Sequence, residues 1–306
     1  MPEVVITEFM DQAAVDTLST RFETLYDPAL VDTPAALAEA VAGARALIVR
    51  NRTQVRGELL AGAGTLTVVG RLGVGLDNID VEACSSRGIE VIPATGANNA
   101  SVAEYVITAA LVLLRGAWLR SAEVAAGAWP RQAMMGQELG GKTLGLIGYG
   151  AIARETATRA CALGMEVVAY DPFLPAGDPG WAGAHPLTLE EVFARSDVLS
   201  LHVPLTDATR HLVNADRLAL MKPGALVINA ARGGVVDEAA LATALRDEKI
   251  GGAALDVFEV EPLTAAAGAQ FNGLNILLTP HIAGVTEESN MRVSALIAEK
   301  IADRLG

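Results

Sequence analysis

Short, continuously apolar runs alternate with alanine-rich stretches along the whole chain. The runs with the length and composition of β-strands cover residues 4–7, 46–50, 66–69, 90–92, 143–147, 166–170, 198–203, 225–229, 253–257 and 276–278. Apolar and polar residues do not alternate within these runs, which is typical of strands that are covered on both faces. Strands that alternate with helices at this pace predict parallel sheets with crossover helices. We therefore expect an α/β fold.

The series of strands is interrupted once, between about residues 92 and 143. A long apolar helix fits this interval, and Ser101 with Glu104 three residues later predicts a capping box at its start. Its longest apolar run, residues 106–114, is too short to cross a bilayer. The interruption predicts two Rossmann-like, doubly wound parallel-sheet lobes with an interdomain cleft.

Composition and charge narrow the classes of partner. The chain has 306 residues, 51% of them hydrophobic, and a net charge of -13. An acidic surface repels nucleic-acid phosphates and anionic membranes, so we expect neither as a partner. Cys84 and Cys161 lack the spacing of metal ligands, so we expect no metal site. Two reduced thiols and an N-terminus without signal-peptide character predict a cytoplasmic protein.

A glycine turn follows the first strand of the second lobe. Gly148 permits the tight turn, and Gly150 lets the backbone approach a pyrophosphate. The helix that begins with Ala151 and Ile152 offers its N-terminal amides to the phosphates. The next strand ends in Asp171, 21 residues after Gly150, where a carboxylate can bind the adenosine ribose hydroxyls. No Arg or Lys follows closely, so the pattern predicts NAD rather than NADP, although a glycine turn can also serve packing alone.

Three polar residues, Arg232, Glu261 and His281, follow strands of the second lobe at the ends where open α/β sheets bind ligands. Taken singly, the arginine is explained as an ion-pair partner, the glutamate as a loop residue and the histidine as a hydrogen-bonding group. Together they fit the reduction of a 2-keto acid. An imidazolium group can protonate the carbonyl oxygen, and a guanidinium group can clamp the carboxylate. Glu261 would keep His281 charged and fix its tautomer. Asp256 is expected to accept a hydrogen bond from the nicotinamide carboxamide.

Several segments in the same order resemble the D-isomer-specific 2-hydroxyacid dehydrogenase family over essentially the full length of the chain. The segments that carry the resemblance are residues 70–80, 98–104, 138–148, 202–210, 229–234 and 279–284. The resemblance implies catalytic roles for the three polar residues above. It also implies a discontinuous layout, in which residues 1–97 and 284–306 form the substrate-binding domain and residues 98–283 the NAD-binding domain. A homodimer is implied as well, with the helix near residues 101–115 at the interface.

The resemblance also extends the list of expected ligand contacts. On the cofactor side it adds His202, Pro204, Thr209, Ala230 and Gly284. In the first lobe it implies that backbone N–H groups of residues 73–75 hold the substrate carboxylate, which suits glycine-rich backbone. Substrate contacts are therefore expected at Val74, Gly75 and Asn98.

The first lobe contains the residues that would select the substrate. Arg50, Asn51 and Arg52 end one strand and Arg71 ends the next, so parallel pairing would bring them together. Cations gathered in an acidic chain suggest a substrate with a second anionic group, although arginines paired with local acids would explain the same pattern. Arg50 and Arg71 resemble positions of phosphoglycerate dehydrogenases, and residues 6–10 and 92–98 resemble the sulfolactate dehydrogenase branch. We expect 3-phosphoglycerate or (S)-3-sulfolactate, with glyoxylate or hydroxypyruvate reduction as the alternative.

An NAD-sensing binding protein of the same fold is the alternative from a different class. Such a protein does not need an acid, a base and an anion clamp together, and all three occur here. A formate dehydrogenase is disfavoured because Glu261 supplies a carboxylate partner that the pattern of those enzymes lacks. We therefore expect an NAD-dependent 2-hydroxyacid dehydrogenase whose physiological direction is open.

Overall fold

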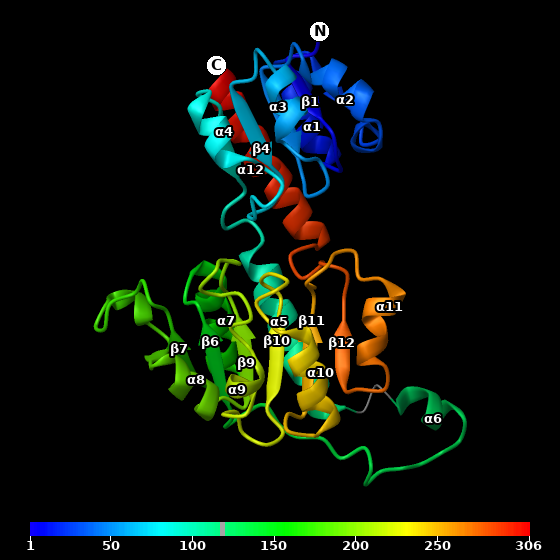
Figure 1. The fold of residues 1–306 in the computed structure, drawn as a ribbon, viewed down its shortest axis with the longest axis vertical. Helices are drawn as coiled ribbons and strands as arrows, with labels where there is room; N and C mark the ends of the chain where they lie inside the picture. Colours follow the sequence, from blue (N-terminus) through cyan, green and yellow to red (C-terminus); the bar gives the residue numbers. More distant parts are fainter. Residues whose placement is uncertain (117–119) are drawn as a thin grey trace. The chain divides into compact units, whose positions relative to one another are not determined.

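The computed structural model describes residues 1–116 and 120–306, which divide into two compact units (Figure 1). Unit 1 comprises Met1–Asn98 and Val285–Gly306, and unit 2 comprises Asn99–Gly284. Each unit is built on one sheet, and every strand pair within the described residues is parallel. The expected α/β fold is therefore confirmed. Across residues 1–116 and 120–306, every helix is too short or too polar to span a membrane.

Unit 1 contains a five-stranded sheet in the order β2-β1-β3-β4-β5. The strands are β1 (Val4–Ile6), β2 (Thr24–Tyr26), β3 (Ala46–Val49), β4 (Val68–Arg71) and β5 (Glu90–Pro93). The helices are α1 (Gln12–Ser19), α2 (Pro34–Val41), α3 (Gly57–Gly62), α4 (Val81–Ser86) and α12 (Glu287–Leu305), with a short 3-10 turn at Leu30–Asp32.

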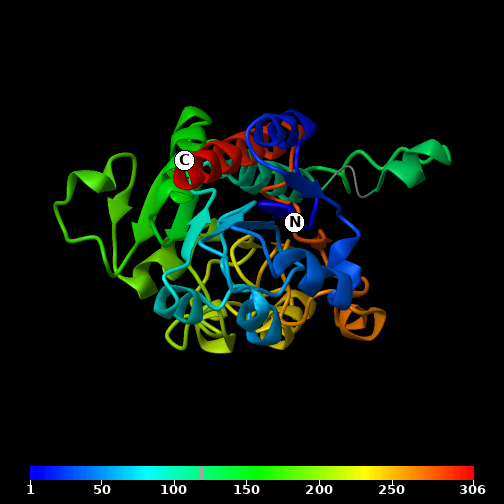
Figure 2. The same cartoon turned by 90° about the horizontal axis from the view of Figure 1, so that it is seen from above.

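Two separate cores explain why the central strands β1 and β3 of unit 1 are apolar at every position. On β1, Val4 and Ile6 pack into the core that contains residues of α1 and α12, whereas Val5 packs into the core that contains residues of α2, α3 and α4. Figure 2 shows α12, in red, lying beside α1, in dark blue, and the two helices are in contact. Successive side chains of a strand point to opposite faces, so a sheet with helices on both faces needs apolar residues throughout.

Unit 2 contains a seven-stranded sheet in the order β12-β11-β10-β9-β6-β7-β8. The strands are β6 (Thr143–Ile147), β7 (Glu166–Tyr170), β8 (His185–Pro186), β9 (Val198–Leu201), β10 (Leu226–Asn229), β11 (Gly252–Leu255) and β12 (Ile276–Leu278). The helices are α5 (Asn99–Arg115), α6 (Ser121–Ala125), α7 (Ala151–Ala162), α8 (Leu189–Arg195), α9 (Ala215–Leu218), α10 (Glu238–Arg246) and α11 (Ala265–Gly268). Short 3-10 turns lie at Pro179–Trp181 and Ala269–Phe271.

The order of the strands reverses once in each sheet, and these points position the functional groups. In unit 2 the first strand, β6, lies between β7 and β9, so the reversal falls at β6 and β9. The glycine turn follows β6 and His202 follows β9, and the His202 N–H donates to the Ile147 carbonyl at 2.7 Å. In unit 1 the reversal falls at β1 and β3. Ligands of open α/β sheets bind beyond the carboxyl ends of the strands at such reversals.

Several local predictions differ from the structure, among them the ends of β9 and β11, which the prediction placed two residues too late. Strands β2 and β8 were not expected; they have three and two residues and lie at sheet edges, so they lack a long buried apolar run. Strand β4 covers Val68–Arg71 rather than residues 66–69. The predicted capping box at Ser101 is wrong, because α5 begins at Asn99 and Ser101 is already a buried residue of its first turn. Glu104 instead forms an ion pair with Arg159 of α7 at 3.6 Å.

Candidate active site

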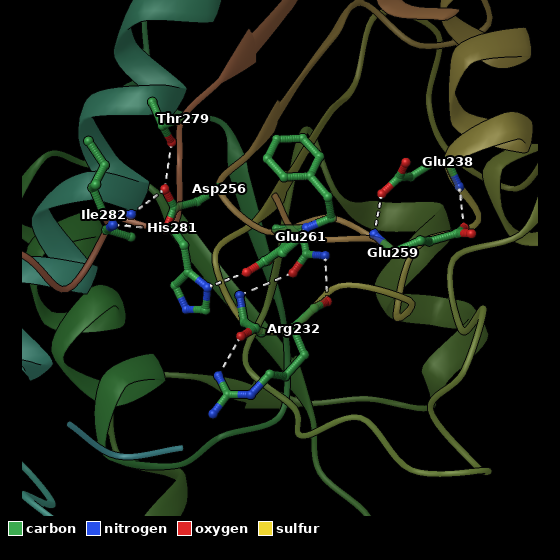
Figure 3. Close-up of polar contacts among 12 residues, drawn as sticks. Arg232, Glu238, Asp256, Glu259, Glu261, Thr279, His281 and Ile282 are labelled. Atoms are coloured by element: carbon green, nitrogen blue, oxygen red, sulfur yellow. Dashed lines mark hydrogen bonds and ion pairs between the residues drawn. The ribbon is translucent and has the colours of Figure 1, made fainter. Parts of the chain in front are cut away.

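His281 and Glu261 form a hydrogen-bonded pair, with Nδ1 of the imidazole 2.8 Å from Oε2 of the carboxylate (Figure 3). The side chains are 45% and 37% exposed, so a ligand can reach them. The second carboxylate oxygen of Glu261 accepts the N–H of Phe258 at 3.0 Å, which fixes the orientation of the carboxylate. Because Nδ1 faces Glu261, Nε2 is the ring nitrogen that can exchange a proton with a substrate.

The surroundings of Glu261 keep its carboxyl group ionised. Burial raises the pKa of Glu261. The hydrogen bonds from His281 and the Phe258 N–H, and the positive charges of His281 and Arg232, lower it by more. The net result is a pKa below the ordinary value of 4.5. A carboxylate is therefore present at neutral pH to stabilise a protonated imidazole.

Asp256, at the carboxyl end of β11, holds the loop that carries His281. The side chain is only 1% exposed. Its Oδ1 accepts the Thr279 hydroxyl at 2.6 Å and the Ile282 N–H at 2.8 Å, and its Oδ2 accepts the Ala283 N–H at 2.8 Å. Because the Thr279 hydroxyl donates to Asp256, it accepts at 2.6 Å from the Tyr105 hydroxyl of α5. The predicted bond to nicotinamide stays a prediction, whereas the contacts to the loop are present without it.

The backbone of His281 lies in the left-handed region, with φ at 57°. This conformation costs an L-residue roughly 1–2 kcal/mol. The His281 N–H donates to the Asp256 carbonyl at 2.8 Å, and the next two N–H groups donate to the Asp256 carboxylate. One aspartate thus stabilises the backbone turn that presents the imidazole.

The loop that carries Arg232 is held by Asn229, the last residue of β10. The Asn229 Nδ2 donates to the Arg232 carbonyl at 2.9 Å, and its Oδ1 accepts the Ala231 N–H at 3.1 Å. Gly233 lies so close to the next loop that an added Cβ would be 1.7 Å from the Phe258 carbonyl oxygen. This contact brings the Arg232 loop against the loop of Glu261. The three residues predicted from strand ends are therefore gathered in one part of unit 2 (Figure 3).

A reciprocal pair of glutamates beside this group was not predicted. The Glu238 N–H donates to Oε1 of Glu259 at 3.2 Å, and the Glu259 N–H donates to Oε1 of Glu238 at 2.6 Å (Figure 3). Burial raises the pKa of Glu238, and the negative charges of Glu259 and Glu261 raise it further, against the hydrogen bond from the Glu259 backbone and the charge of His211. Nε2 of His211 lies 3.2 Å from Oε1 of Glu259. The pair fixes the start of the loop that ends in Glu261.

The glycine turn fits a dinucleotide. Gly148 has φ at 86°, and an added Cβ would lie 2.4 Å from the His202 carbonyl oxygen, so only glycine suits the position. Gly150 differs, because an added Cβ would meet no atom within 4 Å, and no side chain caps the helix that starts at Ala151. Open space in front of uncapped amides is what a pyrophosphate needs.

Asp171 is placed at the end of β7, beside this turn. Its two carboxylate oxygens accept the Tyr149 N–H at 2.8 Å and the Phe173 N–H at 2.9 Å. Each oxygen retains a second lone pair, so the carboxylate can also accept hydrogen bonds from ribose hydroxyls. Ile152 is half-buried in the first turn of α7.

The remaining cofactor-side residues lie after β9, after β10 and at the end of unit 2. His202 is half-buried, and its Nε2 lies 3.0 Å from the Ser200 hydroxyl oxygen. Burial lowers the pKa of His202 to about 4, so the imidazole is neutral at pH 7. Thr209 donates to the Pro204 carbonyl at 2.6 Å, which joins both in one turn. Ala230 and Gly284 are half-buried.

The predicted substrate residues of unit 1 lie at the carboxyl ends of neighbouring strands. In the β3–β4 register Val49 is opposite Arg71. Arg50, the residue after Val49, therefore lies next to Arg71 at the same edge of the sheet. The Arg50 guanidinium donates to Oδ1 of Asn290 at 2.8 Å. The Arg71 guanidinium folds over its own loop, where an added Cβ on Gly73 would lie 1.6 Å from Nη1. Neighbouring cations at two strand ends are therefore present.

The other expected substrate residues differ in exposure. Asn51 is exposed, Val74 is 36% exposed and Gly75 is half-buried. Arg52 pairs with Asp32, so the alternative of a local acid applies to it. The Oδ1 atom of Asn98 is buried, and no hydrogen-bond partner for it lies among residues 1–116 and 120–306.

Three residues whose side chains hold the loops of the predicted site were missed. Glu8 follows β1, and Asn78 lies in the loop after β4; both are buried polar residues beyond a strand. Asn229 ends β10 and is 1% exposed. The signal that revealed Arg232 and His281, a polar residue that follows a buried strand, also exists for these residues. In the part of the chain that the structure describes, no group of three or more His, Cys, Asp or Glu residues is arranged to hold a metal ion.

Comparison with known proteins adds independent evidence. The family model described as "D-isomer specific 2-hydroxyacid dehydrogenase, NAD binding domain" matches residues 107–283. An (S)-sulfolactate dehydrogenase of Chromohalobacter salexigens is 54% identical over 308 residues, which cover 100% of this chain and 99% of that protein. A D-3-phosphoglycerate dehydrogenase of Synechocystis is 37% identical over 100% of this chain, which spans only 54% of that protein.

A solved structure gives the same picture. The D-lactate dehydrogenase of Aquifex aeolicus in complex with NAD and lactic acid superposes with a TM-score of 0.85. The match covers 99% of this chain and 95% of that one at 28% sequence identity.

Proposed function

Because this chain belongs to the D-isomer specific 2-hydroxyacid dehydrogenase family and is an NAD-dependent oxidoreductase of 2-hydroxy acids, we propose that it interconverts (S)-3-sulfolactate and 3-sulfopyruvate. The observation that carries the proposal is 54% identity over the full chain to a protein named (S)-sulfolactate dehydrogenase. The neighbouring Arg50 and Arg71 support it, because guanidinium groups bind tetrahedral oxyanions through paired hydrogen bonds. A sulfonate supplies such an anion beside the carboxylate.

The three polar residues of unit 2 have complementary tasks in this proposal. Arg232 binds the substrate carboxylate and polarises the oxygen on C2. In the oxidative direction, Nε2 of His281 takes the hydroxyl proton, and Glu261 stabilises the imidazolium that forms. Bound NAD supplies the acceptor for the hydride of C2. In the reductive direction the same imidazolium returns its proton to the carbonyl oxygen.

The two units divide the binding tasks. Unit 2 holds NAD through the glycine turn and Asp171, and unit 1 binds the second anion of the substrate through Arg50 and Arg71. The expected interdomain cleft and a cytoplasmic location stay predictions.

We propose a homodimer formed through unit 2, as the resemblance implies. Exposed apolar side chains of unit 2 support this, with Leu111 at 40%, Trp129 at 77% and Met135 at 83% exposure. Sedimentation analysis that finds only monomers at micromolar concentration contradicts it.

A panel of keto acids tests the proposed substrate. The rate of NADH oxidation is measured with sulfopyruvate, phosphohydroxypyruvate, hydroxypyruvate, glyoxylate and pyruvate. We expect the highest kcat/KM with sulfopyruvate. A higher kcat/KM with phosphohydroxypyruvate would show that the second anion of the substrate is a phosphate rather than a sulfonate. A preference for glyoxylate or hydroxypyruvate would show that the substrate has no second anion. Inactivity with all five favours an NAD-sensing binding protein.

Variants of the two arginines test the anion site. We expect Arg50→Ala and Arg71→Ala to reduce kcat/KM for sulfopyruvate by about tenfold or more, as loss of a charged hydrogen bond does, and to spare glyoxylate. Arg45→Ala is the matched control, because Arg45 lies before β3, at its opposite end, and pairs with Glu3 at 3.0 Å. Equal losses with both substrates contradict the assignment.

A further inference from the structure

Glu8 places a carboxylate inside unit 1, directly beyond the end of β1. The residue is 5% exposed. Its Oε1 accepts the N–H groups of Arg50 and Thr53 at 2.9 and 3.0 Å, and its Oε2 accepts those of Asn51 and Arg52 at 3.2 and 3.0 Å. Four consecutive amides therefore converge on one side chain. Successive N–H groups that converge in this way form an anion-binding concavity.

This concavity lies where the strand order of unit 1 reverses. Glu8 follows β1 and the loop of residues 50–53 follows β3, the two strands at the reversal. An open α/β sheet normally offers this position to a ligand. Here the four amides are already bonded to an anion of the chain itself. A substrate anion that reaches this loop must therefore be bound by side chains rather than by these amides.

The same loop is held from its other side. Nδ2 of buried Asn78, in the loop after β4, donates to the Thr53 carbonyl at 2.7 Å and to the Arg50 carbonyl at 3.4 Å. The Arg50 guanidinium donates to Asn290 of α12 at 2.8 Å. Glu8 thus holds the backbone N–H groups of residues 50–53, and Asn78 holds the carbonyl groups of Arg50 and Thr53. Asn290 holds the Arg50 guanidinium. Arg50 has little freedom to change its place.

We infer that Glu8 is a positioning residue for substrate selectivity, which acts as a built-in anion that holds residues 50–53 so that Arg50 meets the second anionic group of the substrate. The inference rests on the proposed function for that second anion. Glu8 itself touches no substrate. Its removal should impair recognition of the second anion and leave the chemistry at C2 in place.

The variant Glu8→Gln tests the inference with little change in volume. Glutamine has one accepting oxygen, so two of the four N–H groups would face its NH2 group, and the loop must rearrange. We expect KM for sulfopyruvate to rise by about ten- to a hundredfold, the range for losing hydrogen bonds to a charged group. We expect kcat with sulfopyruvate and KM for NADH to stay near the wild-type values. KM for glyoxylate should change far less than KM for sulfopyruvate.

The matched control is Glu3→Gln. Glu3 precedes β1 at the opposite end of the same strand and pairs with Arg45. The Glu3→Gln variant should leave KM for sulfopyruvate and KM for glyoxylate unchanged. In Glu8→Ala, added potassium acetate should lower KM for sulfopyruvate, because a free carboxylate can occupy the emptied concavity. Acetate should not lower it in the wild-type protein.

Several outcomes overturn the inference. Equal changes in KM for sulfopyruvate and glyoxylate indicate a general structural role. A lower KM for sulfopyruvate in Glu8→Gln shows that the charge of Glu8 opposes the substrate and that its hydrogen bonds are not needed. Fast hydrogen exchange of amides 50–53 in the wild-type protein overturns the inference without any variant. If wild-type protein does not reduce sulfopyruvate, the proposed substrate has failed, and the comparison is made with phosphohydroxypyruvate instead.

Discussion

Replacing Asp256 by asparagine should release the loop that carries His281. The carboxylate accepts three hydrogen bonds, two at Oδ1 and one at Oδ2. Asparagine can keep the two bonds at Oδ1 only by placing its NH2 group where Oδ2 accepts the Ala283 N–H, at 2.8 Å. Two donors would then face each other in a buried place, since Ala283 is 4% exposed. In the opposite amide orientation the NH2 group faces the Ile282 N–H instead, and the Thr279 hydroxyl must turn from donor to acceptor.

The size of the effect follows from this count. An unsatisfied buried donor costs about 1–3 kcal/mol, so two donors cost about 2–6 kcal/mol. The left-handed backbone conformation of His281 also favours opening of the loop. This conformation costs roughly 1–2 kcal/mol, and the variant loses part of the hydrogen bonding to Asp256 that stabilises it. The lower bound of about 2 kcal/mol corresponds to about thirtyfold in the opening equilibrium. We expect the loop to open locally while the sheet stays folded.

Hydrogen exchange read by mass spectrometry measures this opening. Peptides that contain residues 279–284 should exchange about thirtyfold faster or more in Asp256→Asn, without NAD, and kcat/KM should fall by at least about tenfold. Thr279→Val is the control. It removes the hydroxyl that bonds to Asp256 and Tyr105 and keeps both amide bonds, so exchange at residues 282 and 283 should change far less. Unchanged exchange in Asp256→Asn together with a large loss of activity would refute the positioning role and favour a direct contact with nicotinamide.

Three further predictions address proton transfer, the cofactor and acid stability. His281→Ala should reduce turnover by about 10²–10⁴ with unchanged NADH binding by fluorescence, and full turnover would exclude it as the acid–base group. Asp171→Ala should raise KM for NADH and narrow the NADH/NADPH preference, whereas an unchanged preference contradicts its ribose role. Burial raises the pKa of Glu8, but its hydrogen bonds with Thr53, Arg52 and Arg50 lower it by more, to a net value below 4.5. Its contribution to stability is therefore present at neutral pH and lost as pH falls below about 4.5, so urea unfolding should show the gap between wild type and Glu8→Gln shrinking from pH 7 to pH 3.

The fold was predictable where both faces of a strand are buried. A continuous apolar run such as β6 or β10 has no other easy explanation in a chain of this composition, and the ordered motifs then identified the family correctly. Strands β2 and β8 were not predictable in this way, because an edge strand is stabilised by one neighbour and needs little apolar surface. The prediction from Ser101 was wrong because a capping pattern does not report the conformation of the residues before it. Here the residues before Ser101 are already helical, and α5 begins two residues earlier, at Asn99.

The site was predictable to the extent that chemistry alone selects residue types. Arg232, Glu261 and His281 are the side chains that keto-acid reduction needs, and each follows a strand. Glu8 and the pair of Glu238 and Glu259 have a different basis. Their function depends on which strand lies beside which and on backbone amides that any residue could supply. The place of Glu8 after a strand is visible in the sequence, but the contacts of these glutamates leave no pattern in residue types, so only the three-dimensional arrangement shows what they hold.

The discontinuous build of unit 1 has a consequence for its synthesis on the ribosome. Helix α12 supplies Ile297 and Ile301 to the core of that unit, where they lie against Gly70 so closely that an added Cβ there would be 2.7 Å from Ile297. It also supplies Asn290, which holds Arg50. The sheet of residues 1–98 therefore has one apolar face covered only in part, by α1, until α12 has been synthesised. Unit 2 can fold in the meantime, so the hydrogen bond from Arg50 to Asn290 forms late, and the apolar surface that α12 covers is open to aggregation until then.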